Sequence, residues 1–132
     1  MNFVSIRIIT GDVARLVGFY ERVTGVRANW ATEDFAEIAT DSATLAIAGT
    51  RTLALFAPDL AHPAENRSVI IEFLVDDVDN VHRNLTGFVP DFVQEPTTMP
   101  WGNRSLLFRD PDGNLVNFFT PVTAAAIEKF AR

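Results

Sequence analysis

The first part of the chain changes from a continuous apolar run to a helical period and back to short apolar runs. Residues 3–9 predict a strand, which stops at Thr10-Gly11-Asp12. The next apolar residues recur at helical spacing, with Asp12 as the expected N-cap and Gly25 as the expected C-terminal cap; they are Val13, Leu16, Val17, Tyr20 and Val23. Short β-rich runs follow at 35–39, 44–48 and 52–56. The pattern therefore predicts a strand, an amphipathic helix and three short strands.

The second part of the chain repeats this pattern. Residues 69–75 again predict a strand, ended by Asp76-Asp77, and a shorter helical period then runs to Gly87. Further strands are expected at 92–94, 104–109 and 115–119, the last two joined by the tight turn 110–113. When the halves are superposed, Arg7 lies over Glu72. The repeat predicts two βαβββ modules and hence an α+β fold.

The domain prediction is one domain spanning residues 1–132, because a second independent core would leave each part very small. The first module covers about 1–58 and the second about 68–121. Between them, about 59–67 holds two prolines and no apolar period, which is typical of a connector. A C-terminal helix is expected at about 122–132, capped by Thr123, with Ile127 and Phe130 on its apolar side.

Composition narrows the possible partners. The formal net charge of −6 disfavours nucleic acid and anionic membrane surfaces. The absence of cysteine excludes disulfides, thiolate catalysis and zinc–thiolate sites. The first residues do not have the pattern of a signal peptide, and no apolar run is long enough to span a bilayer. We therefore expect a cytoplasmic protein.

Three stretches carry a resemblance to a known family: residues 8–25, residues 73–78, and the turn Phe108-Arg109-Asp110-Pro111-Asp112-Gly113-Asn114. In this order and spacing the chain resembles the vicinal oxygen chelate superfamily of glyoxalases, bleomycin-resistance proteins and extradiol dioxygenases. The resemblance implies paired βαβββ modules whose curved mixed sheets enclose a cavity, usually in a homodimer. Because one fold hosts many activities, it does not by itself imply a reaction.

Metal-dependent members of this superfamily hold one divalent ion with His, Gln or Glu side chains from the first and last strand of each module. Carried over one by one, those positions fall on Ser5, Ile70 and Asn117, with the fourth on Ala46 or, if the following strand is the equivalent, on Ala54. Alanine and isoleucine have no donor atom for a metal. We therefore expect no metal site and no cofactor. His62, in the connector, and His82, on the second helix, are interpreted as structural or solvated residues.

Strand alternation supplies candidate ligand-binding residues. Ser5 and Arg7 share one face of the first strand, opposite Val4, Ile6 and Ile8, which should pack under the helix. Repeat symmetry places Glu72 at the position that matches Arg7. These two charges either pair with each other and hold the modules in register, or one of them binds a polar ligand group or transfers a proton. Glu72 is in that case the candidate acid or base.

The last strand and the loop before its neighbour add further candidates. Asn117 and Phe119 share a face, and Asn117 offers an amide to a ligand. Trp101 suits a cavity mouth, with Arg104 placed to meet an anion, although a solvated Arg104 is equally consistent. Trp30, Phe35 and Phe56 are aromatic residues typical of a core or a dimer contact.

Three functions remain open at this point. The preferred one is a metal-independent protein that binds or sequesters a small aromatic or polycyclic metabolite. The second is an enzyme of the same superfamily, a lyase, isomerase or dioxygenase-like protein with unusual ligands or with Glu72 acid/base chemistry. The third is a dimeric interaction module without a ligand.

Overall fold

The computed structural model describes residues 1–131. The chain divides into two compact units, Met1–Asn66 with Pro111–Gly113 and Arg67–Asp110 with Asn114–Arg132. The boundary between Asn66 and Arg67 falls at the end of the predicted connector. Each unit is built on its own four-stranded sheet.

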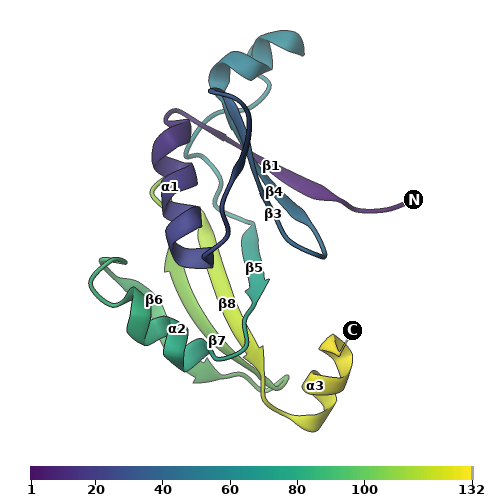
Figure 1. The fold of residues 1–132 in the computed structure, drawn as a ribbon, viewed down its shortest axis with the longest axis vertical. Helices are drawn as coiled ribbons and strands as arrows, with labels where there is room; N and C mark the ends of the chain where they lie inside the picture. The colour runs from purple at the N-terminus through teal and green to yellow at the C-terminus, as the bar shows by residue number, and fades with distance from the viewer. Residues whose placement is uncertain (132) are drawn as a thin grey trace. The chain divides into compact units, whose positions relative to one another are not determined.

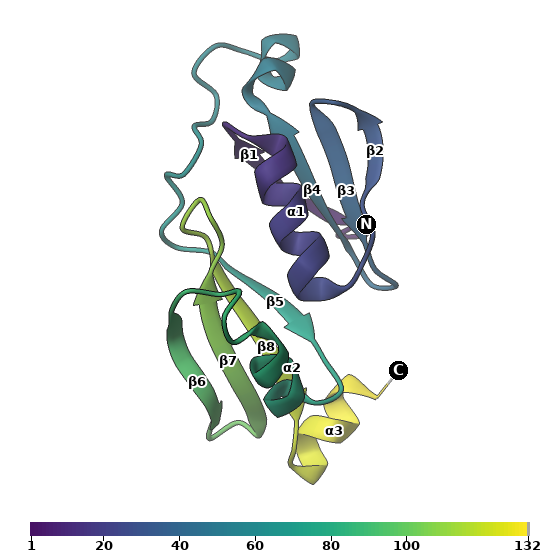
Figure 2. The same cartoon turned by 60° about the vertical axis from the view of Figure 1, so that its left-hand side comes forward.

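The first module consists of six elements in chain order (Figures 1 and 2): β1 (Ser5–Thr10), α1 (Val13–Thr24), β2 (Asn29–Thr32), β3 (Phe35–Ala39), β4 (Thr44–Gly49) and the 3₁₀ helix η1 (Thr50–Leu55). The sheet order is β1-β4-β3-β2, with β1 parallel to β4 and the other pairs antiparallel. Helix α1 begins where Asp12 accepts a hydrogen bond from Arg15 N and ends at Gly25, whose φ of 72° is left-handed. Both predicted caps are confirmed.

Two expectations for the first module are wrong. Residues 52–56 do not form a strand, because the chain after Gly49 closes into η1, where Thr52 Oγ1 donates to the Gly49 carbonyl. The third antiparallel strand is β2 instead. Val4 and Ile6 are also exposed rather than packed under the helix. Helix α1 covers β3 and β4, so the start of the edge strand β1 stays uncovered.

The second module repeats the topology with β5 (Ile70–Leu74), α2 (Val78–Leu85), β6 (Phe92–Thr98), β7 (Asn103–Arg109) and β8 (Leu115–Pro121). Its sheet order is β5-β8-β7-β6, and β5 is parallel to β8. The predicted α+β fold of two βαβββ modules with mixed sheets is confirmed (Figure 1).

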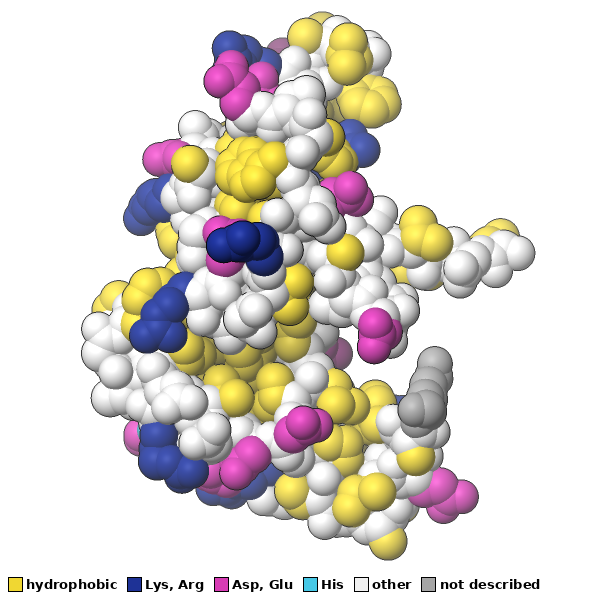
Figure 3. All heavy atoms as spheres, viewed as in Figure 1, with side chains coloured by type: hydrophobic (Ala, Val, Ile, Leu, Met, Phe, Trp, Pro, Cys, Tyr) yellow, Lys and Arg dark blue, Asp and Glu magenta, His cyan; other side chains and the backbone are white. Residues whose placement is uncertain are grey.

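The C-terminal helix α3 spans Ala124–Phe130, shorter than the predicted 122–132. Thr123 caps it as expected, accepting a hydrogen bond from Ala126 N. Phe130 packs on Phe119 of β8, but Ile127 is 53% exposed. Only one of the two residues of the expected apolar side therefore packs on the sheet. Exposed hydrophobic side chains gather around this helix in Figure 3, at the lower right of the view.

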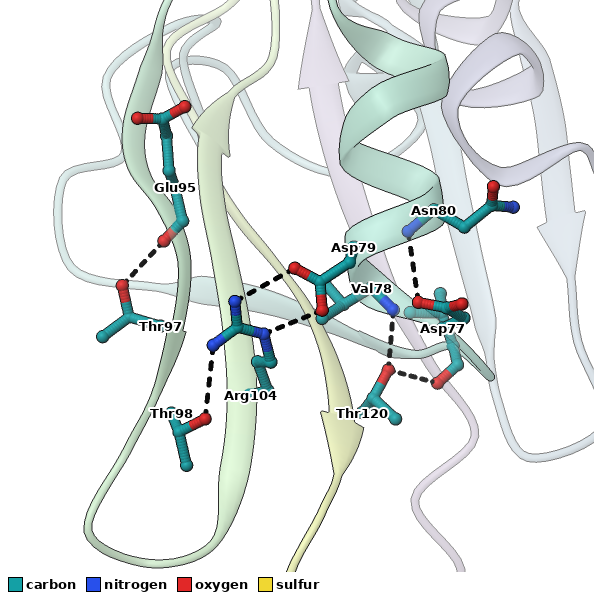
Figure 4. A network of polar contacts seen from close by, with 10 residues as sticks. Asp77, Val78, Asp79, Asn80, Glu95, Thr97, Thr98, Arg104 and Thr120 are labelled. Carbon is teal, nitrogen blue, oxygen red and sulfur yellow. Dashed lines mark hydrogen bonds and ion pairs between the residues drawn. The ribbon is translucent and has the colours of Figure 1, made fainter.

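The core of the second module is aromatic and lies between its sheet and α2. Phe118 contacts Phe73 and Phe108 edge to face, with ring centroids 5.3 and 5.2 Å apart. Val78 and Leu85 of α2 are buried against this sheet. The helix start is tied to β8 by Thr120, whose hydroxyl accepts from Val78 N and donates to the Val75 carbonyl (Figure 4). Within residues 1–131, no helix is long and apolar enough to cross a membrane.

Candidate functional site

The strand register shows which predicted site residues share a face. In the first module Arg7 is paired with Ala46, which is paired with Glu37. In the second module Glu72 is paired with Asn117. Arg7 and Glu72 therefore occupy equivalent places in the two sheets, as the repeat predicts, and Ala46 is the equivalent of Asn117.

Alternation along the strands then defines two surfaces, each opposite the face that packs on its helix. We call the first the Arg7 face: it consists of Ser5, Arg7, Phe35, Glu37, Thr44 and Ala46. The second, the Glu72 face, consists of Ile70, Glu72, Leu74, Leu115, Asn117 and Phe119.

The centre of the Glu72 face is a hydrogen-bonded pair. Asn117 Nδ2 donates to Glu72 Oε2 at 2.8 Å. Asn117 is only 8% exposed, whereas Glu72 is exposed. The other amide atom, Asn117 Oδ1, is buried and accepts no hydrogen bond from the described residues. A buried acceptor left without a donor costs about 1–3 kcal/mol, so a donor that reached this oxygen would stabilise the folded chain.

Apolar side chains surround the Glu72–Asn117 pair. Ile70 and Leu74, one on each side of Glu72 along β5, are both 48% exposed. Phe119 shares the face with Asn117, as expected, but it is buried against Phe130 of α3, with ring centroids 5.1 Å apart. The face thus presents a carboxylate with exposed apolar surface beside it.

The Arg7 face has the opposite charge and a different arrangement. The Arg7 guanidinium lies over the rings of Phe35 and Phe56, 5.0 and 6.0 Å from their centroids. Such stacking leaves the in-plane N–H groups of arginine free to donate. Ser5 is exposed two residues earlier on β1, and Ala46 provides no polar group between Arg7 and Glu37. The predicted pairing of Arg7 with Glu72 stays a prediction.

The metal-ligand positions implied by the resemblance can now be tested on donor chemistry. Ala46 pairs with Arg7 in the same way as Asn117 pairs with Glu72, so the strand register favours Ala46 as the fourth ligand position. The alternative, Ala54, lies in η1 and is not on a sheet strand. Ala46 in the first module and Ile70 in the second have no ligand atom, so these residues do not fit a divalent metal ion. Across the described part of the chain, no three His, Cys, Asp or Glu side chains are grouped as a metal site.

Arg104 lies on the other face of the second sheet, toward α2. Its Nε and Nη2 donate to the Asp79 carboxylate at 2.8 and 3.0 Å, and its Nη1 donates to Thr98 at 3.3 Å (Figure 4). Trp101, 67% exposed, occupies the turn between β6 and β7. The structure therefore brings neither residue beside the Glu72–Asn117 pair.

The Arg104 ion pair makes a prediction about stability and pH. The hydrogen bonds from Arg104 hold the pKa of Asp79 below its ordinary value. Because the pKa of Asp79 is lower in the folded than in the unfolded state, its ionised carboxylate stabilises the fold at pH values above the unfolded-state pKa of about 4. This contribution is lost as the pH falls through the folded-state pKa. Asp79→Asn is therefore expected to flatten the fall in stability below about pH 4. Urea denaturation between neutral and acidic pH measures this, with the exposed Asp41→Asn as control. An unchanged acid limb would contradict it.

Two contacts were missed by the sequence interpretation. The partner of Glu72 within its module is Asn117. The repeat implies that β5 and β8 pair in parallel, and that register could have predicted this contact. The partner of Arg104 is Asp79 in the first turn of α2, for which the sequence carried no spacing signal. His82 Nε2 lies 3.4 Å from Glu95 and its ring meets Phe92 edge to face, consistent with a structural role.

Each βαβββ module has a four-stranded mixed sheet with a charged residue, Arg7 or Glu72, at the equivalent place on the face opposite its helix. The model of the Glyoxalase/Bleomycin resistance protein/Dioxygenase superfamily matches residues 2–118. The chain belongs to this superfamily. No curated protein matched it.

Solved structures show the same fold. A glyoxalase/bleomycin resistance protein/dioxygenase family enzyme from Burkholderia phytofirmans PsJN is 16% identical with a TM-score of 0.79, and the match covers 92% of this chain and 100% of that one. A glyoxalase/bleomycin resistance protein/dioxygenase from Nocardioides is 20% identical with a TM-score of 0.75, covering 94% and 85%. Lactoylglutathione lyase from Agrobacterium tumefaciens is 17% identical with a TM-score of 0.70, covering 89% and 92%. At these identities the likeness establishes the fold.

Proposed function

We propose that the chain is a small-molecule-binding protein of the glyoxalase/bleomycin-resistance type that binds or sequesters an aromatic or polycyclic metabolite without a metal ion. The observation that carries this proposal is the donor set at the family's ligand positions. Ala46 and Ile70, two of the four positions that the resemblance implies, have no coordinating atom, and the strand register favours Ala46 over Ala54 for the fourth position. A chelate mechanism like that of metal-dependent relatives has no support in these residues.

Each of the two sheet faces, taken by itself, supports binding of a flat apolar molecule. Phe35 and Phe56 offer rings beside the Arg7 guanidinium, and Ile70 and Leu74 offer exposed apolar surface beside Glu72. Ligand sites in proteins combine an apolar lining with a few polar groups that fix orientation. In this proposal the protein is a homodimer, it is located in the cytoplasm, and its only class of partner is a small molecule.

A second candidate is an enzyme in which Glu72 transfers a proton. One observation favours it: the Glu72 carboxylate is exposed while one of its oxygens is held by Asn117. A general base needs both a fixed position and access to its substrate. Turnover of a bound metabolite that is abolished by Glu72→Gln would select this candidate over sequestration.

Native mass spectrometry of the freshly purified protein, beside the denatured mass, tests the proposal. A metal-free dimer that carries additional organic mass is the expected result. A dimer with stoichiometric metal would overturn the metal-independent proposal, and a dimer with neither would favour a pure interaction module.

Thermal denaturation gives an independent prediction about metals. A ligand that binds only the folded state raises the melting temperature. Because two of the four ligand positions lack donor atoms, Zn²⁺, Ni²⁺, Mn²⁺ or Fe²⁺ is expected to give no concentration-dependent rise, and EDTA no fall. Ile70→His with Ala46→Glu is the matched variant, since it restores donors; a metal-dependent rise in the unmodified protein would contradict the prediction.

A further inference from the structure

The Glu72–Asn117 pair presents a carboxylate and more hydrogen-bond acceptors than donors to a ligand. Asn117 Nδ2 carries two N–H groups, and one of them donates to Glu72 Oε2. This contact also sets the orientation of the amide, because turning Oδ1 toward the carboxylate would bring two negative oxygens together. A ligand therefore meets chiefly the carboxylate of the exposed Glu72; beside it lie the buried Oδ1 and the second N–H of Asn117.

This arrangement selects among ligand groups. A carboxylate or phosphate carries negative charge and would be repelled by the Glu72 carboxylate, and a carbonyl has no donor to offer it. A neutral hydroxyl supplies one donor. A protonated primary amine supplies three donors and a positive charge, and its hydrogen bonds to a carboxylate are the stronger, charge-assisted kind. The amide oxygen stabilises the same cation through its partial negative charge, even without direct contact.

The surroundings of Glu72 indicate the rest of the ligand. Ile70 and Leu74 flank it on β5 and are half exposed, so a ligand body that covers them gains by removing apolar surface from water. We propose that the Glu72 face binds an organic cation, a protonated amine attached to a flat apolar body. This inference rests on the proposed function and names the chemical class of its ligand.

Two cations among the described residues lie near this face: Arg109 of β7 and Lys129 of α3, whose ammonium is 5.2 Å from the centroid of the Phe130 ring that packs on Phe119. Arg109 pairs with Leu115, which pairs with Ile70. Arg109 therefore lies on the same face as Glu72, two strands away from β5 and level with Ile70, two residues before Glu72. Strand and residue spacings put the two backbones about 12 Å apart. Arg109 and Lys129 are both exposed, so solvent and salt screen their repulsion of a bound cation, whereas a hydrogen-bonded contact at Glu72 acts at short range.

Isothermal titration calorimetry with three probes of one size tests the inference: naphthylmethylammonium, naphthylmethanol and naphthoate. The ammonium probe is expected to bind most tightly. Glu72→Gln is expected to weaken it by about tenfold or more, the usual effect of losing a charge-assisted hydrogen bond, and to leave the neutral probe unchanged. Asn117→Leu, which keeps the side-chain volume, is expected to weaken the ammonium probe as well. Melting curves of each variant verify folding.

Glu95→Gln is the matched control. Glu95 carries the same charge in the same module, is 76% exposed, and contacts His82 of α2 instead of the Glu72 face. It is expected to bind the ammonium probe as the unmodified protein does. If naphthylmethanol or naphthoate binds as well as the ammonium probe, or if Glu72→Gln changes nothing, the inference is overturned and the proposed function stands. If no probe binds and native mass spectra show no organic mass, both fall.

Discussion

Phe118→Ala is expected to destabilise the second module by about 3–5 kcal/mol, the usual cost of removing a buried phenylalanine. Phe118 is 1% exposed and lies in the middle of β8, between Phe73 of β5 and Phe108 of β7. Its removal eliminates two edge-to-face ring contacts and leaves a cavity that two flanking strands prevent from collapsing. Urea denaturation followed by circular dichroism measures the loss.

The control for this prediction is Phe3→Ala, which removes the same side chain where it is 74% exposed. Its effect is expected to stay within about 0.5 kcal/mol. Phe118→Leu should fall between the two variants, because leucine refills part of the volume. A loss below about 1 kcal/mol for Phe118→Ala would mean that these rings do not form the core of the second module.

Gly102→Ala is expected to destabilise the chain by about 2–4 kcal/mol, combining backbone strain with overpacking. Gly102 has a φ of 95°, which is left-handed and unfavourable for alanine. A methyl group here would also overlap the Thr123 hydroxyl and stand 3.0 Å from Ala126 Cβ. Thr123 caps α3 and donates its backbone N–H to the Gly102 carbonyl, so the substitution pushes α3 away from the β6–β7 turn.

Gly11→Ala is the appropriate comparison, since its added methyl group meets nothing within 4 Å and no positive φ is required. It is expected to change the free energy of unfolding by less than about 0.5 kcal/mol. Hydrogen exchange of α3 amides in Gly102→Ala should accelerate before the rest of the module does. Protection of α3 equal to that in the unmodified protein would contradict the proposed docking through Gly102.

Several site residues were predictable because they depend on local rules. Period-two alternation places Asn117 and Phe119 on one face regardless of what covers them, and repetition of the module places Glu72 at the position of Arg7. Arg104 was not predictable in the same way. Its position on the strand was readable, but the element facing it was not, and the structure supplies Asp79 of α2.

The sequence by itself determined the βαβ core of each module, the caps at Asp12, Gly25 and Thr123, and the absence of donor atoms at Ala46 and Ile70, but not β2 or η1. These features follow from side-chain chemistry and from hydrogen bonds between near neighbours in the chain. Tertiary structure alone decided that Asn117 holds Glu72 while its Oδ1 stays undonated, because that contact joins residues distant in sequence through the register of β5 and β8. It also decided that residues 50–55 close into a 3₁₀ helix, since an apolar run becomes a strand only where another strand is available to pair with it.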